Sequence, residues 1–365
     1  MRPALASGLK IMETDYYSPD FATAQRRFRE AANAAGAEWE SLPLAARGPD
    51  GEPLAIDVAW LGTRQPRRIL LHTTGLHGIE GFAGSAVQLC LLAHRPKPPD
   101  DAALVFMHVL NPYGMAWLRR FNENNVDLNR NFLAPGESFT GVADAYRVLN
   151  GLLNPPTPPR SRDLFLLRAG AYVARYGFAR LKQAIAEGQY EYPQGLFFGG
   201  KQGEPTAEAV IAWSRRWLAG AERVFVIDVH TGLGPWGQDS LLTHYPPGSE
   251  RVERLSQRWG RRVHAWSPSG VAYKIRGGFL ETLERELAPA DVTTICQEFG
   301  AYRPLQTLYA LREENRLHHW GNARQLDHSA KRRLLEVFCP CDPNWRRQIV
   351  QRGEALFQDV LMDLL

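Results

Sequence analysis

The sequence predicts an α/β protein in which a mixed, mostly parallel, twisted sheet carries helices on both faces. Short runs of aliphatic and β-branched residues alternate along the chain with longer segments whose apolar residues recur at helical spacing. Several of the short runs end in glycine or proline, which is typical of strands that stop at a turn. With 365 residues, of which 44% are hydrophobic, the chain is long enough to bury a large core.

The first predicted element is an N-terminal helix at about residues 18–36. Ser18 and Pro19 have the residue types of an N-cap and a first-turn position, and Gly36 has that of a C-terminal stop. A turn at residues 48–53 follows this helix. The next predicted elements are two strands and a helix, at residues 54–62, 67–74 and 84–95.

Later strands are predicted at residues 103–112, 223–232 and 292–300, with helices between them. Residues 133–195 differ, because a proline cluster is followed there by a long segment of helical pattern without a clear strand. We interpret this region as a helical insertion within a single domain that spans residues 1–365. The tail from about residue 306 is predicted to be mostly helical.

Composition narrows the classes of function. The longest apolar runs fall well short of the roughly 20 residues that a membrane-spanning helix needs, and the N-terminus lacks the apolar block of a signal peptide. A cytoplasmic protein without a membrane partner is therefore expected. The net charge of +4 is spread along the chain, which argues against a nucleic-acid partner. The oligomeric state is left open.

Polar residues follow or end three of the predicted strands. His77 and Glu80 come directly after residues 67–74, whereas His230 and Glu298 lie near the ends of later strands. Ligands of open α/β sheets bind at the carboxyl ends of the strands, so these residues are expected to converge. Two imidazoles and a carboxylate are a common ligand set for catalytic zinc. Glu298 would then be available as a general base.

Each of these residues also has an ordinary structural interpretation. A histidine at a strand end is more often hydrogen-bonded within the fold than a metal ligand. Glu80 could simply favour the start of a following helix through the helix dipole, and Glu298 could pair with a buried arginine. A His-x-x-Glu spacing is common by chance, so specificity has to come from the surrounding motifs.

Those motifs occur in a characteristic order. The chain contains "HGIE" at residues 77–80, "NPYG" at 111–114, "RRFNENNVDLNRNF" at 119–132, "DVHTG" at 228–232 and "QEFG" at 297–300. In this order they resemble the zinc carboxypeptidase superfamily, the carboxypeptidase A-like metallopeptidases. More closely, the chain is similar to a bacterial branch without an assigned substrate. The resemblance extends over about residues 54–305.

The resemblance implies roles for individual residues. The implied ligands of one zinc ion per chain are His77, Glu80 and His230, and the implied general base and proton shuttle is Glu298. Arg120 matches the arginine that stabilises the oxyanion, with Arg119 as the open alternative. For binding of the substrate, the implied residues are Asn129 and Arg130 at its carboxylate and Tyr273 as the tyrosine that closes over it. Asp127 and Asp228 are candidates for orienting these groups.

The leading functional hypothesis is a zinc-dependent hydrolase that cleaves an amide bond next to a free carboxylate, as carboxypeptidase-type metallopeptidases do. An aspartoacylase-type deacylase of N-acyl amino acids is the alternative, so the expected partner is a small peptide or an acyl amino acid. A non-catalytic metal-binding protein is a third hypothesis, against which the presence of Glu298 argues. The sequence contains neither a Gly-x-Ser-x-Gly motif nor a His-Glu-x-x-His motif.

Overall fold

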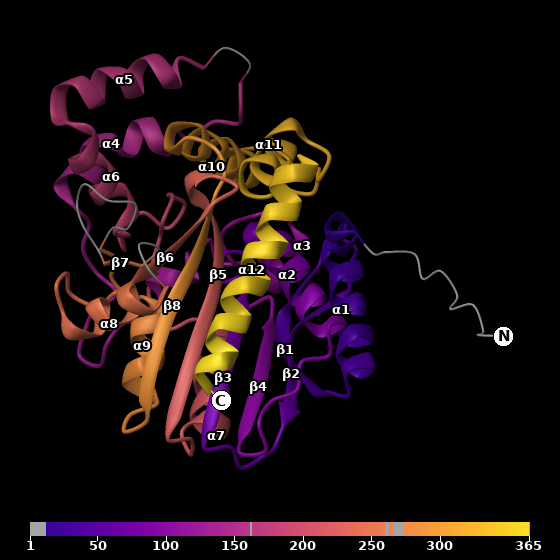
Figure 1. The fold of residues 1–365 in the computed structure, drawn as a ribbon. Helices are drawn as coiled ribbons and strands as arrows, with labels where there is room; N and C mark the ends of the chain where they lie inside the picture. Colours follow the sequence, from indigo (N-terminus) through magenta and orange to yellow (C-terminus); the bar gives the residue numbers. More distant parts are fainter. Residues whose placement is uncertain (1–11, 161–162, 260–262, 266–273, 365) are drawn as a thin grey trace.

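The structure is a computed structural model that describes residues 12–160, 163–259, 263–265 and 274–364. Its centre is one eight-stranded sheet with the strand order β1-β2-β4-β3-β5-β8-β6-β7 (Figure 1). The strands are β1 (Glu38–Arg47), β2 (Pro53–Gly62), β3 (Arg68–Thr74), β4 (Ala102–His108), β5 (Arg223–Trp236), β6 (Asp239–Thr243), β7 (Val263–Ala265) and β8 (Asp291–Gly300).

The middle of the sheet is parallel and its margins are mixed. Strands β4, β3, β5 and β8 run parallel to one another, β1 and β2 are antiparallel additions on one side, and β6 is antiparallel to β8 on the other. The predicted mixed, mostly parallel sheet is therefore confirmed. The carboxyl ends of the four central strands share one edge, at which ligands of such sheets bind.

Helices cover both faces of the sheet. They are α1 (Phe21–Ala35), α2 (Gly81–Ala93), α3 (Pro112–Ala116), α4 (Asp144–Leu153), α5 (Phe165–Tyr176), α6 (Phe178–Ala186), α7 (Pro205–Leu218), α8 (Glu250–Trp259), α9 (Phe279–Glu286), α10 (Pro304–Trp320), α11 (Ser329–Phe338) and α12 (Pro343–Leu364), with the short 3₁₀ helices η1 (Glu13–Tyr16), η2 (Gly78–Glu80) and η3 (Leu128–Arg130). No helix in the described part of the chain combines the length and the apolar character that crossing a membrane requires.

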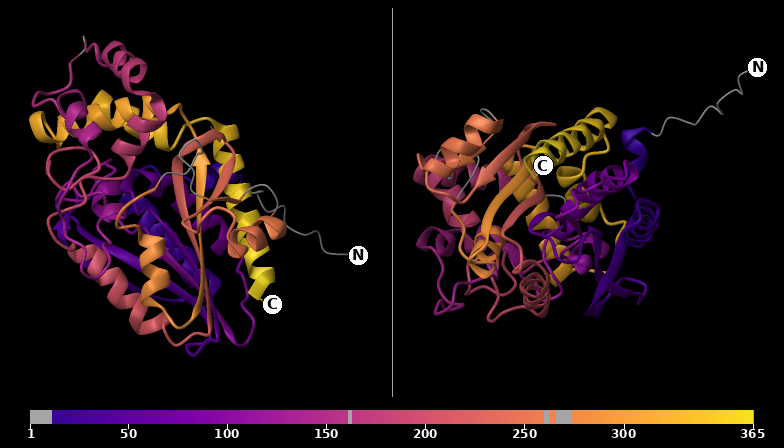
Figure 2. Two further views of the ribbon diagram at one scale, coloured as in Figure 1. Left: turned by 90° about the vertical axis from the view of Figure 1, so that its left-hand side faces the viewer. Right: turned by 60° about the horizontal axis from the view of Figure 1, so that its bottom comes forward.

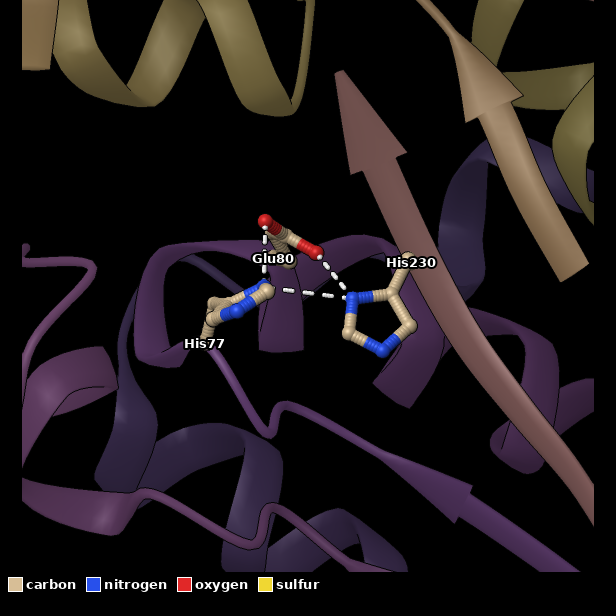
Figure 3. A group of neighbouring side chains, drawn as sticks. All are labelled: His77, Glu80 and His230. Carbon is tan, nitrogen blue, oxygen red and sulfur yellow. Dashed lines mark hydrogen bonds and ion pairs between the residues drawn. The ribbon is translucent and has the colours of Figure 1, made fainter. Parts of the chain in front are cut away.

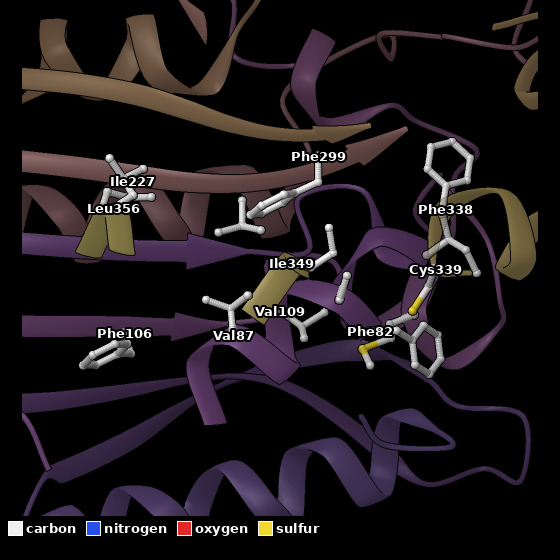
Figure 4. Packing of buried hydrophobic residues seen from close by; sticks show 14 of the residues in the cluster. Phe82, Val87, Phe106, Val109, Ile227, Phe299, Phe338, Cys339, Ile349 and Leu356 are labelled. Carbon is white, nitrogen blue, oxygen red and sulfur yellow. The ribbon is translucent and has the colours of Figure 1, made fainter. Parts of the chain in front are cut away.

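Alternate residues of the central strands point into two hydrophobic cores. Leu70 and Ile227 belong to the core that also contains residues of α1, α2 and α12, and Figure 4 shows Ile227 near Leu356 of α12. Their neighbours Leu71 and Val226 belong to the other core, against α7 and α9. Since side chains alternate along a strand, a strand buried on both faces is apolar throughout. This explains why the central strands are recognisable in the sequence.

The N-terminal helix begins later than predicted. Asp20, not Ser18, is the N-cap, because its side chain accepts a hydrogen bond of 2.7 Å from the backbone N–H of Thr23. Ser18 and Pro19 precede the helix. Aspartate and serine are similarly good N-caps, so the local sequence did not decide between them. The predicted stop at Gly36 is confirmed by its left-handed backbone, with φ 78°.

The region from residue 133 to 195 contains α4, α5 and α6. These helices lie with α10 above the edge where β5 and β8 end (Figures 1 and 2). They form a small core of their own, which includes Leu149, Phe165 and Leu181 and packs against Leu308 of α10. The helical pattern of residues 162–188 is interrupted at Gly177, whose φ of 82° separates α5 from α6. The insertion therefore covers the edge of the sheet at which a site was predicted.

Candidate metal centre

The structure brings His77, Glu80 and His230 together at the carboxyl ends of the parallel strands. His77 precedes η2, and Glu80 ends it directly before α2. His230 lies in β5, which is hydrogen-bonded to β3 on one side and to β8 on the other. In the register of β5 and β8, His230 is the partner of Glu298. Neighbouring parallel strands therefore present all four residues at one edge.

The loop that carries His77 and Glu80 fits closely against its neighbour. Gly78 packs against Gly114 of α3, and a Cβ atom at Gly78 would lie 2.2 Å from the carbonyl carbon of Gly114. Any side chain at residue 78 would have to push two backbone segments apart. The glycine of the "HGIE" motif thus allows the close approach that sets the position of both flanking residues.

The polar atoms of these three side chains face a common point (Figure 3). His77 Nδ1 is 2.9 Å from Glu80 Oε1, His230 Nδ1 is 3.0 Å from Glu80 Oε2, and the two Nδ1 atoms are 3.2 Å apart. Two ligand atoms each about 2.0 Å from a tetrahedral zinc ion would be about 3.3 Å apart. The donor atoms and their spacing therefore fit a zinc ion. A second group in the described chain, Cys90, His94 and Glu354, is less buried.

Carboxylates on the far side of each imidazole fix its orientation. Asp228 Oδ2 is 2.7 Å from His230 Nε2, and Asp228 also accepts a hydrogen bond of 2.6 Å from Thr73 Oγ1. Asp127 Oδ1 is 3.2 Å from His77 Nε2. Burial opposes the charge of Asp127, but Arg120, Arg130 and His77 hold the pKa of Asp127 well below its ordinary value. Protons on both Nε2 atoms leave the two Nδ1 atoms as metal ligands.

Replacing Asp228 by asparagine should weaken metal binding without removing a ligand. The amide cannot accept the Nε2 proton as a carboxylate does, so we expect roughly 10- to 100-fold lower zinc affinity, measured by competition with a chelator. Asp57, a buried aspartate of β2 that accepts a hydrogen bond from Arg29 of α1, is the control. Asp57→Asn should leave zinc affinity unchanged. Equal affinities of Asp228→Asn and the unaltered protein would contradict the orienting role.

Glu298 lies beside the three candidate ligands without belonging to them. Its Oε1 accepts a hydrogen bond of 2.9 Å from the backbone N–H of Leu233, and the residue is 6% exposed. Burial, reinforced by the negative charge of Glu80, raises the pKa of Glu298 to about 8. In contrast, the pKa of Glu80 is lowered against the effect of burial, because His77 and His230 contact it. The two carboxylates therefore have different proton affinities. No pattern in the sequence predicts that the backbone N–H of Leu233 orients Glu298.

The two neighbouring arginines point to different places. Arg120 donates hydrogen bonds to Asp127 Oδ2 at 3.0 Å and to Glu80 Oε1 at 3.1 Å. Arg119 is fully buried and donates to Glu314 and Asn125 instead, so Arg120 is the arginine at the candidate centre. Arg120 Nη2 also lies 2.7 Å from His77 Nε2. That nitrogen carries a proton when Nδ1 binds a metal, so Arg120 must then turn toward another acceptor.

The residues predicted to bind a substrate carboxylate are separated. Asn129 lines a cavity of about 450 Å³ that also reaches His77 and Glu298, and its Oδ1 accepts a hydrogen bond from Phe279 N–H. Arg130 is fully buried, and its Nε donates to the carbonyl of Ala186 at 2.9 Å. Its position therefore does not support the predicted contact with a substrate. The sequence could not show that α6 of the insertion places a carbonyl beside Arg130. Tyr273 lies outside the described residues.

A second cavity, of about 150 Å³, reaches the centre from the side of the insertion. It is lined by His77, Glu80, Arg120 and Glu298 together with residues of α4, α5, α6 and α10. His77 and Glu298 line both cavities. The two cavities therefore meet at the candidate centre.

Several solved structures are similar to this one. Carboxypeptidase A from Helicoverpa armigera is 13% identical, with a TM-score of 0.47 over 86% of this chain and 75% of that chain. A protein assigned as a metallopeptidase from Shewanella amazonensis SB2B is 16% identical, with a TM-score of 0.43 over 90% and 95%. Murein-tripeptide amidase MpaA from Escherichia coli O157 is 19% identical, with a TM-score of 0.36 over 76% and 91%. All three similarities are at low sequence identity.

Sequence comparison gives a family match. No curated protein matches the chain significantly. Residues 17–352 match the family model described as a protein of unknown function, DUF2817, which covers most of the described sheet and helices. The chain therefore belongs to the DUF2817 family.

Proposed function

We propose that this chain is a zinc-dependent hydrolase of amide bonds. The observation that supports this proposal is the position of Glu298, a buried carboxylate beside His77, Glu80 and His230 that faces both cavities. A protein that only stored metal would have no use for a base in that place. A zinc ion held by the three residues would supply a Lewis acid and lower the pKa of a water molecule.

Each side chain of the site then has its own role in the proposed reaction. His77, Glu80 and His230 hold the ion, while Asp127 and Asp228 keep the two imidazoles in the required tautomer. Glu298, oriented by the N–H of Leu233, takes a proton from the attacking water and passes it to the leaving amine. Arg120, once turned from His77, places positive charge where the carbonyl oxygen becomes negative.

Two substrate classes are compatible with such a site. In the first, a carboxypeptidase-type reaction, the enzyme cleaves a peptide next to its free carboxylate, which Asn129 and a basic side chain would bind. In the second, a deacylase releases an amino acid from its acyl group. The burial of Arg130 against Ala186 does not separate the two classes, because a peptide and an N-acyl amino acid both carry a carboxylate next to the amide that is cleaved. A cytoplasmic location stays a prediction.

A substrate panel separates these classes. The zinc-loaded protein would be given peptides with a free C-terminus, the same peptides with an amidated C-terminus, and N-acyl amino acids. Cleavage of the free peptides alone would indicate a carboxypeptidase, and cleavage of the acyl amino acids alone a deacylase. Absence of turnover on the whole panel, with zinc bound, would contradict the proposed hydrolase.

Arg130→Lys tests the role of Arg130 directly. Lysine keeps the charge but cannot donate two hydrogen bonds to the buried carbonyl of Ala186 as the guanidinium does. The free energy of unfolding should therefore fall by about 1–3 kcal/mol. We expect this loss in urea unfolding, with little change in KM. Arg147→Lys, at an exposed ion pair with Glu191, is the control and should change stability little. If Arg130→Lys instead raised KM for a substrate with a free carboxylate and left stability unchanged, Arg130 would be a carboxylate-binding residue.

A further inference from the structure

The cavity of about 150 Å³ beside α4, α5 and α6 is lined mainly by aliphatic and aromatic side chains. Helix α4 contributes Leu149, Leu152 and Leu153, and α10 contributes Leu305, Leu308 and Leu311. Helices α5 and α6 add further aliphatic and aromatic side chains, among them Phe165 and Ile185. Helix α10 is far from the insertion helices in the sequence but packs beside them in the structure (Figure 2). The result is an apolar chamber beside the candidate metal centre.

The chamber connects the centre with the surface. At one end its lining includes His77 and Glu298, and elsewhere it includes Phe178, which is 52% exposed. Besides the residues of the candidate centre, the side chains of the described lining that carry a polar group are Tyr172, Lys182, Thr231 and Thr307. The hydroxyl of Thr307 is buried without a hydrogen-bond partner. The walls of the chamber therefore offer few polar groups to a ligand.

The other cavity that reaches the centre, of about 450 Å³, has a different lining. Its described lining includes Asn129, His244, Lys274 and Glu281, all of which can form polar contacts. A peptide or amino acid with a carboxylate finds hydrogen-bond donors there. The candidate centre thus adjoins two different environments, one polar and one apolar.

We propose that the substrate carries a long aliphatic acyl chain and that the part of this chain next to the amide occupies the apolar chamber formed by α4, α5, α6 and α10, with the remainder directed toward the surface at Phe178. This inference rests on the proposed hydrolase function and specifies its substrate as a long-chain N-acyl amino acid. An extended peptide in the chamber would bury N–H and C=O groups, each of which needs a hydrogen-bond partner. A hydrocarbon chain has no such requirement and gains free energy from every methylene that leaves water.

The reaction that follows from this arrangement is a hydrolysis. Water adds its oxygen to the acyl carbon, the C–N bond breaks, and the proton taken up by Glu298 is passed to the departing amine. The products are a long-chain carboxylate in the chamber and a free amino acid in the polar cavity. No oxidant, reductant or second substrate besides water is required.

Binding can be measured without turnover. The full chain with Glu298→Gln, loaded with zinc, would be titrated by calorimetry with N-lauroyl-glycine and with N-acetyl-glycine. Transfer of one methylene from water to an apolar environment strengthens binding roughly three- to fourfold. Even if only part of the chain is buried, the lauroyl compound should bind at least about 100-fold more tightly. Equal affinity of the two compounds would overturn the proposal.

Filling the chamber should remove this preference. Ala169 on α5 is buried and lines the chamber, whereas Ala174 on the same helix is exposed and does not. In the Glu298→Gln background, Ala169→Phe should weaken lauroyl-glycine binding at least about tenfold and leave acetyl-glycine binding unchanged, and Ala174→Phe should change neither. Val173→Phe, at a half-buried position of the lining, tests the same point if Ala169→Phe does not fold. Unchanged lauroyl-glycine binding in folded Ala169→Phe or Val173→Phe protein would overturn the proposal.

Failure of this inference differs from failure of the proposed function. If the protein without substitutions cleaves acetyl-glycine and lauroyl-glycine at equal kcat/KM, the hydrolase stands and the acyl-chain chamber is refuted. If lauroyl-glycine binds tightly and Ala169→Phe abolishes the effect, the chamber is supported. Absence of cleavage by the zinc-loaded protein would then count against the hydrolase alone.

Discussion

Glu298→Gln should lose nearly all turnover while keeping its zinc. Glu298 is hydrogen-bonded to Leu233 N–H and is not one of the three residues whose donor atoms converge. The substitution is almost isosteric and leaves His77, Glu80 and His230 unchanged. Positioned acid–base groups contribute on the order of 10²–10⁴-fold in rate, so kcat should fall by at least the lower figure. Zinc content is measured in the same preparation by elemental analysis.

A second glutamate controls for the loss of charge. Glu208 lies on α7 at an exposed position, so Glu208→Gln should retain both activity and zinc. Two outcomes of the Glu298→Gln experiment would refute the assignment. Loss of zinc together with activity would make Glu298 a ligand, and turnover within a few-fold of the unaltered protein would place the base elsewhere.

Removing the ligand histidines should remove the metal. The protein is expected to bind one zinc ion per chain, and His77→Ala or His230→Ala leaves two protein ligands where a catalytic site has three. Most of the bound zinc should be lost from either variant after dialysis. Because a ligand that binds only the folded state stabilises it, these variants should also lose the increase in Tm that added zinc gives the unaltered protein.

The matched control is His94→Ala. His94 belongs to the other group of potential ligands, with Cys90 and Glu354, and it is exposed. Burial and the charge of Glu354 raise the pKa of the Cys90 thiol to about 12, which disfavours the thiolate that a metal requires. His94→Ala should therefore retain the zinc. Full zinc content in a His77→Ala, His230→Ala double variant would show that the metal lies elsewhere.

The sequence by itself determined the central sheet and the group of candidate ligands. Strands β2, β3, β4, β5 and β8 are buried, so each leaves a run of apolar residues that can be recognised locally. The ligand motifs directly follow or end such runs, and parallel strands bring their carboxyl ends to one edge whatever the details of packing. The convergence of His77, Glu80, His230 and Glu298 could thus be predicted.

The weaker strands could not be predicted in this way. Strand β1 is largely exposed, carries charged residues and includes Pro43, whereas β7 has three residues. Strand β6 has five residues and pairs with β8 in the antiparallel direction. Short or exposed strands lack an apolar run, and their place depends on the neighbouring strand to which they bond.

Only the tertiary structure decided which of the two adjacent arginines lies at the candidate centre. Arg119 and Arg120 are adjacent in the sequence, but Arg119 donates a hydrogen bond to Glu314 of α10. Arg120 donates to Asp127 and Glu80 instead. Arg130 is likewise held by Ala186, at the end of α6. The apolar chamber arises from four helices, none of which forms it alone. A motif specifies the residue types at one place in the chain, but the contacts of long side chains depend on distant segments that only folding brings near.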